Sequence, residues 1–330
     1  MKKISVGVIG CGQFGEKHIA VYSQMETVHL EIICDLDKSR AESIAKKYNV
    51  PRWTTDVDEI FQDPTINAVS IVSPEPLHFE HGMKAFEGNK HVLIEKPMAT
   101  DVEQTDKLIR TAREKNLVLM PGHILRFESR YILAYERLNA LGKIYSIYSR
   151  RNLPKNLRSI YTRVHPAQMT LPHDIDLVLW FTNSEPKTVY SVERSTQHND
   201  QIDMVWSLVE FKDGCIVCLE SSWLLPEREG IFPDSMMEII GENGSIKISY
   251  PSNDVVYYGE KGEEKFDTSL WPILYGELQG AIKNELEHFI QCVKERRYSN
   301  IVPPEVSAKS IRLTEAIISS AEASKVINLK

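Results

Sequence analysis

Glycines and one acidic residue near the amino end have the types and spacing of a dinucleotide-binding site. Gly10, Gly12 and Gly15 directly follow an apolar run and open a stretch with helical spacing. In such a turn the first glycine permits the bend, the second lets the backbone approach a pyrophosphate, and the third allows close helix–strand packing. Gln13 and Phe14 belong to the same turn, and the helix N-terminus would hold the anion.

Asp35 ends the second apolar run, about twenty residues after Gly15, where a carboxylate accepts hydrogen bonds from an adenosine ribose. Leu36 follows at the place where a 2′-phosphate would need a cation. We therefore expect NAD as the cofactor, because the carboxylate would repel that phosphate. NADP stays open, since Lys38 or Arg40 could reach round to it.

A second group with chemical potential, Glu95-Lys96-Pro97, comes directly after the fourth apolar run. A doubly wound sheet binds its ligands at this carboxyl end of its strands. A partly desolvated Lys96 beside a nicotinamide could hydrogen-bond a reacting hydroxyl or carbonyl and stabilise developing negative charge. A solvated turn is the alternative that the residues alone leave open.

The elements that must position these residues alternate along the first part of the chain. Continuous apolar runs between amphipathic stretches indicate βαβ units around a parallel sheet covered on both faces. We therefore expect an α/β Rossmann domain with a doubly wound parallel sheet over residues 1–122. The predicted strands are 4–9, 30–34, 68–72, 91–94 and 117–120, and the predicted helices are 14–25, 38–48, 77–87 and 102–115.

After residue 122 the pattern changes, and we expect an α+β domain with an open, mainly antiparallel sheet over residues 123–330, for substrate binding and oligomerisation. Turn residues at 212–214 and 241–244 predict hairpins, and Pro303-Pro304 separates two final helices. The predicted strands are 144–148, 188–192, 204–211, 215–223, 236–240 and 245–248, and the predicted helices are 129–141, 274–294 and 306–325.

One face of this second sheet should lack helices and carry exposed apolar residues, such as Val205, Leu208 and Val217. Exposed apolar patches commonly mark association surfaces. We therefore expect a homodimer or homotetramer that forms through the sheet.

Composition narrows the class of protein. A chain of 330 residues favours two packed domains, and its 42% apolar and 26% charged residues are those of a globular protein. A net charge of −7 argues against nucleic-acid or anionic-membrane partners. No apolar run has the length of a membrane span or of a signal sequence, and the five cysteines form no disulfide framework, so we expect a cytoplasmic protein.

The sequence lacks the motifs that metal-dependent and hydrolytic chemistry require. Cys215 and Cys218 lie in an apolar run, which favours core thiols over a zinc site. No Gly-x-Ser-x-Gly elbow or Walker motif occurs. We expect no bound metal, because metal-ligand spacing is also missing around His18, His29, His81, His198 and His288.

These motifs together resemble the glucose–fructose oxidoreductase, inositol dehydrogenase and rhizopine catabolism (Gfo/Idh/MocA) family. The resemblance runs nearly end to end through Gly10-x-Gly12-x-x-Gly15, Ser73-Pro74-x-x-x-His78, the segment 88–97, and His173-Asp174-Ile175-Asp176 before Trp180.

The family resemblance implies roles for particular residues. Lys96 would be catalytic, and the Lys96-Pro97 bond could be cis. His173 would be the general base that takes the hydroxyl proton, the alternative being a core or capping histidine. The nicotinamide half of the cofactor would be held by Ser73, Pro74, His78, Glu95, Lys96 and Pro97.

The chain departs from the family at Met169, where many members have an aspartate four residues before the histidine. The usual carboxylate that orients the base is therefore missing. Substitute contacts could come from His165, Gln168, Asp174 or Asp176, although the two aspartates fit equally well as helix-start residues.

The same resemblance places a substrate pocket around residues 122–127 and 150–152. Arginines there would suit phosphate or carboxylate recognition, although surface ion pairs are the alternative. The expected pocket residues are His123, Arg126, Arg151, Asn152, His165 and Met169.

The function that this resemblance implies is that of an NAD(P)-dependent dehydrogenase. It would transfer hydride between nicotinamide and a secondary alcohol of a sugar, cyclic polyol or sugar nucleotide, with Lys96 polarising oxygen and His173 moving the proton. Two other hypotheses stay open. One is NAD(P)H-dependent reduction of a carbonyl or imine. The other is a catalytically silent dinucleotide-binding sensor, which Met169 allows and which the retention of both Lys96 and His173 disfavours.

Overall fold

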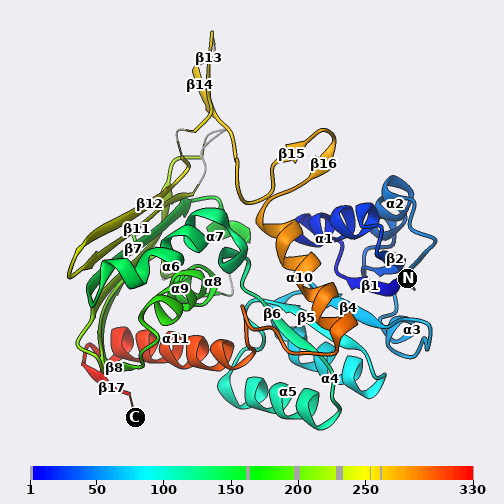
Figure 1. Cartoon of the computed structure of the whole chain (residues 1–330), viewed down its shortest axis with the longest axis horizontal. Helices are drawn as coiled ribbons and strands as arrows, with labels where there is room; N and C mark the ends of the chain where they lie inside the picture. Colours follow the sequence, from blue (N-terminus) through cyan, green and yellow to red (C-terminus); the bar gives the residue numbers. More distant parts are fainter. Residues whose placement is uncertain are drawn as a thin grey trace. The chain divides into compact units, whose positions relative to one another are not determined.

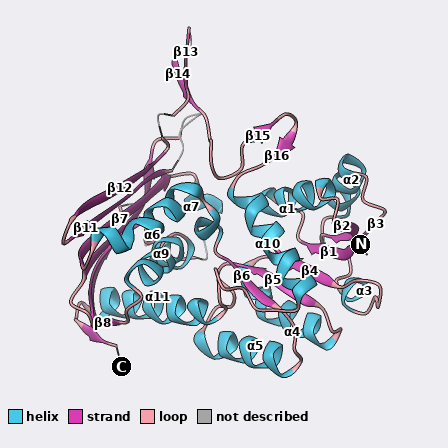
Figure 2. Cartoon of the chain, viewed as in Figure 1, coloured by secondary structure: helices cyan, strands magenta, loops and turns pink. Residues whose placement is uncertain are grey.

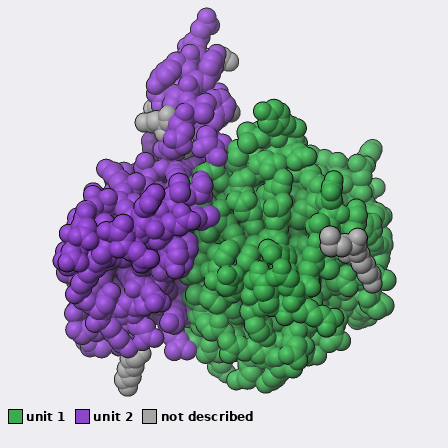
Figure 3. Space-filling view, viewed as in Figure 1, with its two compact units in different colours: residues 1–128, 269–308 green, residues 129–268, 309–330 purple. Residues whose placement is uncertain are grey.

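The computed structural model describes residues 3–160, 164–196, 201–227, 233–252, 254–260 and 262–329. The chain divides into two compact units (Figure 3): residues 1–128 with 269–308, and residues 129–268 with 309–330. The first unit extends past the boundary expected after residue 122. It also includes a late segment that the sequence analysis assigned to the second domain.

A parallel sheet of six strands forms the centre of the first unit (Figure 1). Its order, β3-β2-β1-β4-β5-β6, places β1 beside β4, so the direction of winding reverses between these two strands. This is the order of a dinucleotide-binding sheet, and the predicted Rossmann fold is confirmed. The strands are β1 (Ile4–Ile9), β2 (Val28–Cys34), β3 (Arg52–Thr54), β4 (Ala68–Ile71), β5 (His91–Glu95) and β6 (Leu119–Gly122).

Amphipathic helices cover this sheet close to where they were predicted. The Asp101 carboxylate caps α5 by accepting from the Gln104 amide at 2.8 Å. The short β3 and α3 were not predicted. The helical elements are α1 (Gln13–Gln24), α2 (Lys38–Tyr48), α3 (Asp58–Phe61), η1 (Glu75–Leu77), α4 (His78–Glu87), α5 (Val102–Glu114) and η2 (Ile124–Phe127).

The late segment of the first unit forms a hairpin and then a helix that packs against α1. The prediction of one helix over residues 274–294 was wrong at its start, because α10 (Ala281–Glu295) begins later. Strands β15 (Ile273–Leu274) and β16 (Glu277–Leu278) precede it. Tyr275 has φ 53° and Gly276 has φ 84°, and these left-handed conformations make a tight turn that no helix can contain.

The second unit is built on a sheet of seven strands in the order β12-β11-β7-β10-β9-β8-β17. Its neighbours pair antiparallel except β7 and β10, which are parallel. The predicted open, mainly antiparallel sheet is therefore confirmed. The strands are β7 (Ile144–Pro154), β8 (Pro186–Arg194), β9 (Met204–Phe211), β10 (Ile216–Leu225), β11 (Asp234–Gly241), β12 (Gly244–Tyr250) and β17 (Ile327–Asn328).

Helices lie along one face of this sheet (Figure 2). A separate hairpin, β13 (Val256–Gly259) and β14 (Gly262–Lys265), extends from the same unit. The helices are α6 (Ser129–Leu141), α7 (Leu157–Ile160), α8 (Pro166–Met169), α9 (Pro172–Thr182) and α11 (Glu305–Ala323), which belongs to this unit from Lys309 on.

The other face of the sheet carries exposed apolar side chains, as expected. The prediction of which residues are exposed was wrong for two of the three. Val205 and Val217 are fully buried, whereas Leu208 is 53% exposed. Val205 and Leu208 are three residues apart on one strand, so they point to opposite faces. The exposed apolar residues of the sheet strands are Tyr145, Tyr190, Val192, Trp206, Leu208, Ile216 and Ile240.

Cys215 and Cys218 are free thiols, Cys215 directly before β10 and Cys218 within it. Cys215 is fully buried, and burial raises the pKa of its thiol to about 12. Among the described residues no group of histidine, cysteine and carboxylate side chains could hold a metal ion. His198 lies outside the described residues. Within the same ranges, no helix is long and apolar enough to cross a membrane.

Candidate functional site

The glycine-rich turn follows β1 and leads into α1, as predicted. Gly10 has φ +98°, and a Cβ there would lie 2.5 Å from the Val72 carbonyl oxygen. A Cβ on Gly15 would lie 1.9 Å from the Gly10 oxygen, so both positions require glycine. Gly12 is different, because a Cβ there would meet no described atom within 4 Å. Gly12 is the N-cap of α1. The open space beside it therefore adjoins the N–H groups of the first helical turn, which suit a phosphate.

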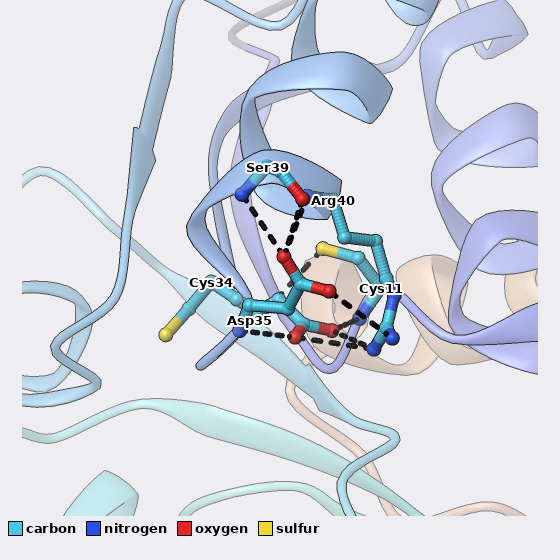
Figure 4. Close-up of polar contacts among 6 residues, drawn as sticks. Cys11, Cys34, Asp35, Ser39 and Arg40 are labelled. Atoms are coloured by element: carbon cyan, nitrogen blue, oxygen red, sulfur yellow. Dashed lines mark hydrogen bonds and ion pairs between the residues drawn. The ribbon is translucent and has the colours of Figure 1, made fainter.

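Asp35 lies at the carboxyl end of β2, beside this turn (Figure 4). Its carboxylate accepts hydrogen bonds from the Cys11 amide at 2.8 Å and the Asp37 amide at 2.9 Å. Nη1 of Arg40 lies 3.3 Å and 3.4 Å from its two oxygens. The acidic residue is therefore held in place beside the glycine-rich turn.

Lys38 and Arg40, the cations that kept NADP open, both have partners in the chain. Arg40 is paired with Asp35 and with Asp37. The Lys38 ammonium lies 5.9 Å from the centre of the Trp53 ring, within reach of a cation–π contact.

The loops after β4 and β5 lie at the same edge of the sheet, because β4 pairs parallel with β1 and β5 pairs parallel with β4. Ser73 and Pro74 follow β4, and Lys96 follows β5 directly. The Ser73 hydroxyl is 3.0 Å from Nδ1 of His81. The Lys96-Pro97 peptide bond is cis. The expected cofactor residues of this unit therefore come together at one sheet edge.

In the second unit, His173 lies in the first turn of α9. The next residue, Asp174, fixes that turn to β7. Its carboxylate accepts from the Ser149 hydroxyl at 2.7 Å and from Nε and Nη2 of Arg151 at 2.8 Å and 3.1 Å. Arg151, expected in the substrate pocket, is thus engaged in a buried, bidentate ion pair.

Met169 ends the short helix α8, which His165 caps. His165 accepts from the Ala167 amide at its Nδ1, and its Nε2 lies 3.0 Å from the Glu193 carboxylate. Burial lowers the pKa of His165, and the bond to Glu193 opposes this. Both ring nitrogens of His165 therefore have partners within the second unit.

The other expected pocket residues also contact neighbours within their own units. Nε2 of His123 is 3.0 Å from the Ser307 hydroxyl, and Nη1 of Arg126 donates to the Ile301 carbonyl at 2.8 Å. Both side chains are buried. The amide of Asn152 bonds to Ser222 and Glu220.

Two buried histidines, His18 and His81, lie beside the carboxyl edge of the first sheet and were not predicted as site residues. His81 contacts Ser73, and Nε2 of His18 lies 3.4 Å from the Glu95 carboxylate. Both were judged only for metal-ligand spacing. A better signal was their place on helices, His18 one turn after Gly15 and His81 one turn after His78.

Comparison with known proteins agrees with both halves of the fold. The family model described as "Oxidoreductase family, NAD-binding Rossmann fold" matches residues 4–123. The model described as "Oxidoreductase family, C-terminal alpha/beta domain" matches residues 166–329.

Characterised relatives are similar over most of the chain. The scyllo-inositol 2-dehydrogenase (NAD(+)) of Bacillus subtilis is 27% identical over 307 residues, which cover 88% of this chain and 86% of that protein. The UDP-N-acetylglucosamine 3-dehydrogenase of Acidithiobacillus ferrooxidans is 30% identical over 258 residues, 78% of each chain.

A solved structure shares the fold along its full length. It is the scyllo-inositol dehydrogenase from Lactobacillus casei with bound NAD(H) and scyllo-inositol. The TM-score is 0.86, the sequence identity is 20%, and the alignment covers 99% of both chains.

Proposed function

The chain belongs to the Gfo/Idh/MocA family of oxidoreductases, and on that premise we propose that it is a dehydrogenase. It oxidises, reversibly, a secondary alcohol of a sugar, cyclic polyol or sugar nucleotide, with NAD as the hydride acceptor. The relatives named above, which act on an inositol and on a sugar nucleotide, support this substrate class.

One observation carries the proposal. The loops after β1, β4 and β5 are neighbours at the carboxyl edge of one parallel sheet. They contain the glycine-rich turn, Ser73 and Lys96 in that order. A group that can polarise oxygen therefore lies at the edge where a dinucleotide binds, which is the arrangement that alcohol oxidation needs.

The residues present fit NAD. The open space beside Gly12 suits the pyrophosphate, and Asp35 suits the adenosine ribose. When bound, NAD accepts the hydride that leaves the alcohol carbon. The Lys96 ammonium donates a hydrogen bond to the substrate oxygen and stabilises its developing negative charge. His173 takes the hydroxyl proton, so the products are a ketone, the reduced cofactor and a proton.

Asp176 is our candidate for the carboxylate that replaces the family aspartate at Met169. Its side chain is buried and lies one helical turn after His173 on α9.

We also propose that copies of the chain associate into a homodimer or homotetramer through the helix-free face of the second sheet. The exposed apolar side chains on β7, β8, β9, β10 and β11 support this proposal.

The test is cofactor reduction with a panel of inositols, sugars and sugar nucleotides, comparing the wild type with Lys96→Ala and His173→Ala. We expect turnover with at least one polyol and a loss of at least about 100-fold in kcat in each variant, with NAD affinity retained in His173→Ala. Tight NAD binding without turnover on any substrate would contradict the dehydrogenase and favour the sensor. Turnover only from NADH with carbonyl or imine substrates would favour the reductase.

A further inference from the structure

The segment from Glu95 to Pro97, which carries Lys96, is contacted by a histidine on α4. Nδ1 of His78 is 2.7 Å from the Pro97 carbonyl oxygen, and Nε2 is 2.7 Å from the Ser73 carbonyl oxygen. His78 is almost fully buried. Both of its nitrogens therefore contact the protein backbone, and the ring joins the loop after β4 to the loop after β5.

The protonation state of His78 decides how many of these two contacts are hydrogen bonds that the ring donates. A carbonyl oxygen only accepts, so a neutral imidazole donates to one of the two loops and an imidazolium donates to both. Burial lowers the pKa of His78, while the bonds to Pro97 and Ser73 oppose this. In either state the ring fills the space between the two loops.

At the other end of the segment, the Glu95 carboxylate makes two contacts. One of its carboxylate oxygens accepts from the Lys96 amide at 3.3 Å, and the other lies 3.4 Å from Nε2 of His18. His18 is fully buried on α1. A Cβ on Gly122 would lie 2.5 Å from Glu95 Oε1, so the end of β6 leaves just enough room for this carboxylate.

The same helix turn also holds Ser73. His81 lies one turn after His78 on α4 and contacts the Ser73 hydroxyl. The carbonyl and the hydroxyl of Ser73 are thus both fixed by α4, which makes the loop after β4 a firm support for the bridge to Pro97.

We propose that His78 is a positioning residue for Lys96, supported by the His18–Glu95 pair at the other end of the segment. Lys96 lies between Glu95 and Pro97, and each of these has its own buried histidine contact. These contacts fix the backbone from which the Lys96 side chain reaches the substrate oxygen. The inference rests on the proposed dehydrogenase function, because it assigns Lys96 the reacting oxygen. Small misplacements of such a group cost large factors in rate.

The test compares His78→Phe, which keeps an aromatic ring but has no donor, with His78→Asn, which keeps an N–H donor group in its side-chain amide. The control is His288→Phe, which also removes a histidine–serine contact in the first unit, to Ser299. We expect His78→Phe to lower kcat by about 10- to 100-fold with Kd for NAD within about threefold of wild type. His78→Asn should recover part of kcat, and His288→Phe should leave kcat unchanged.

A double-variant cycle separates positioning from a general structural role. If His78 acts through Lys96, His78→Phe should lower the residual turnover of Lys96→Ala by less than about threefold. A full, additive loss in that background would overturn the proposal. So would a His78→Phe variant that loses NAD binding in step with kcat.

A second readout needs no turnover and keeps this inference separate from the proposed function. An amine-acylating reagent labels Lys96 at a rate that depends on its exposure and pKa, and mass spectrometry of the Lys96 peptide measures that rate. We expect the rate to change at least about threefold in His78→Phe and in His18→Phe, and to stay unchanged in His288→Phe. Unchanged labelling in both variants would overturn the positioning role even if every polyol failed as a substrate.

Discussion

Arg40 Nη1 lies 3.3 Å and 3.4 Å from the two carboxylate oxygens of Asp35. The cation that could have bound a 2′-phosphate is therefore paired with the carboxylate that would repel one (Figure 4). Asp35 also accepts from the Cys11 amide in the glycine-rich turn. In the proposed NAD site, Asp35 thus connects the expected cofactor selectivity to the shape of the glycine-rich turn.

Replacement of Asp35 should weaken NAD binding and relax the discrimination against NADP. Asp35→Ala removes a charged acceptor, and such hydrogen bonds contribute about 1.5–3 kcal/mol, which corresponds to roughly 10- to 100-fold in Kd. It also removes one of the two carboxylates that pair with Arg40, which makes this cation more available to a phosphate. Calorimetric titration with NAD and NADP measures both effects. Arg40→Ala is the matched control, because it should leave NAD affinity within about threefold, and an Asp35→Ala variant with wild-type selectivity would contradict the assignment.

The buried pair of Arg151 and Asp174 should be essential for the stability of the second unit. The two side chains are 12% and 2% exposed, so removing one partner leaves a buried charge. We expect Arg151→Met to lower the free energy of unfolding by about 3–5 kcal/mol, measured by urea denaturation. Lys187→Met, which breaks the exposed pair with Glu210, should cost less than about 1 kcal/mol. Equal losses in the two variants would contradict this contrast.

The parts of the site that could be predicted are those that local sequence determines. The turn from Gly10 to Gly15 and Asp35 follow strands directly, so a strand pattern and residue types were enough to place them. The contact of His18 with Glu95 could not be predicted, because it joins a helix to a strand far along the chain. The same holds for Arg151 and Asp174, whose approach depends on the packing of α9 on β7.

Stability should fall as the pH is lowered from 7.5 to 5.5. Burial lowers the pKa of His78, His81 and His91 below the ordinary value. Below about pH 6.5 the unfolded chain therefore binds more protons than the folded chain, which favours unfolding, and above pH 7.5 the effect is absent. Thermal unfolding at the two pH values measures the effect, and a Tm that rises at pH 5.5 would contradict it.

The Asp176 carboxylate should affect the proton-transfer step rather than cofactor binding. Asp176→Asn keeps the size of a side chain that is 1% exposed but removes its charge. If it supports His173, kcat should fall by about 10-fold or more and the acid limb of the kcat/KM profile should move, with Kd for NAD unchanged. Glu193→Gln, which alters the partner of His165, serves as the comparison. An unchanged pH profile in Asp176→Asn would show that Asp176 does not replace the family aspartate at Met169.

The helix-free face of the second sheet should be where copies of the chain meet. Leu208 on β9 is 53% exposed and has Tyr190 and Cys218 as its cross-strand neighbours. Leu208→Glu places a charge in that apolar surface, and burying an unpaired charge in an interface is costly. We expect the variant to sediment as a smaller species than the wild type in analytical ultracentrifugation. Leu133→Glu is the matched control, because Leu133 is similarly exposed but lies on α6, and it should sediment like the wild type. A monomeric wild type, or an assembly that Leu208→Glu leaves intact, would show that this face is not the association surface.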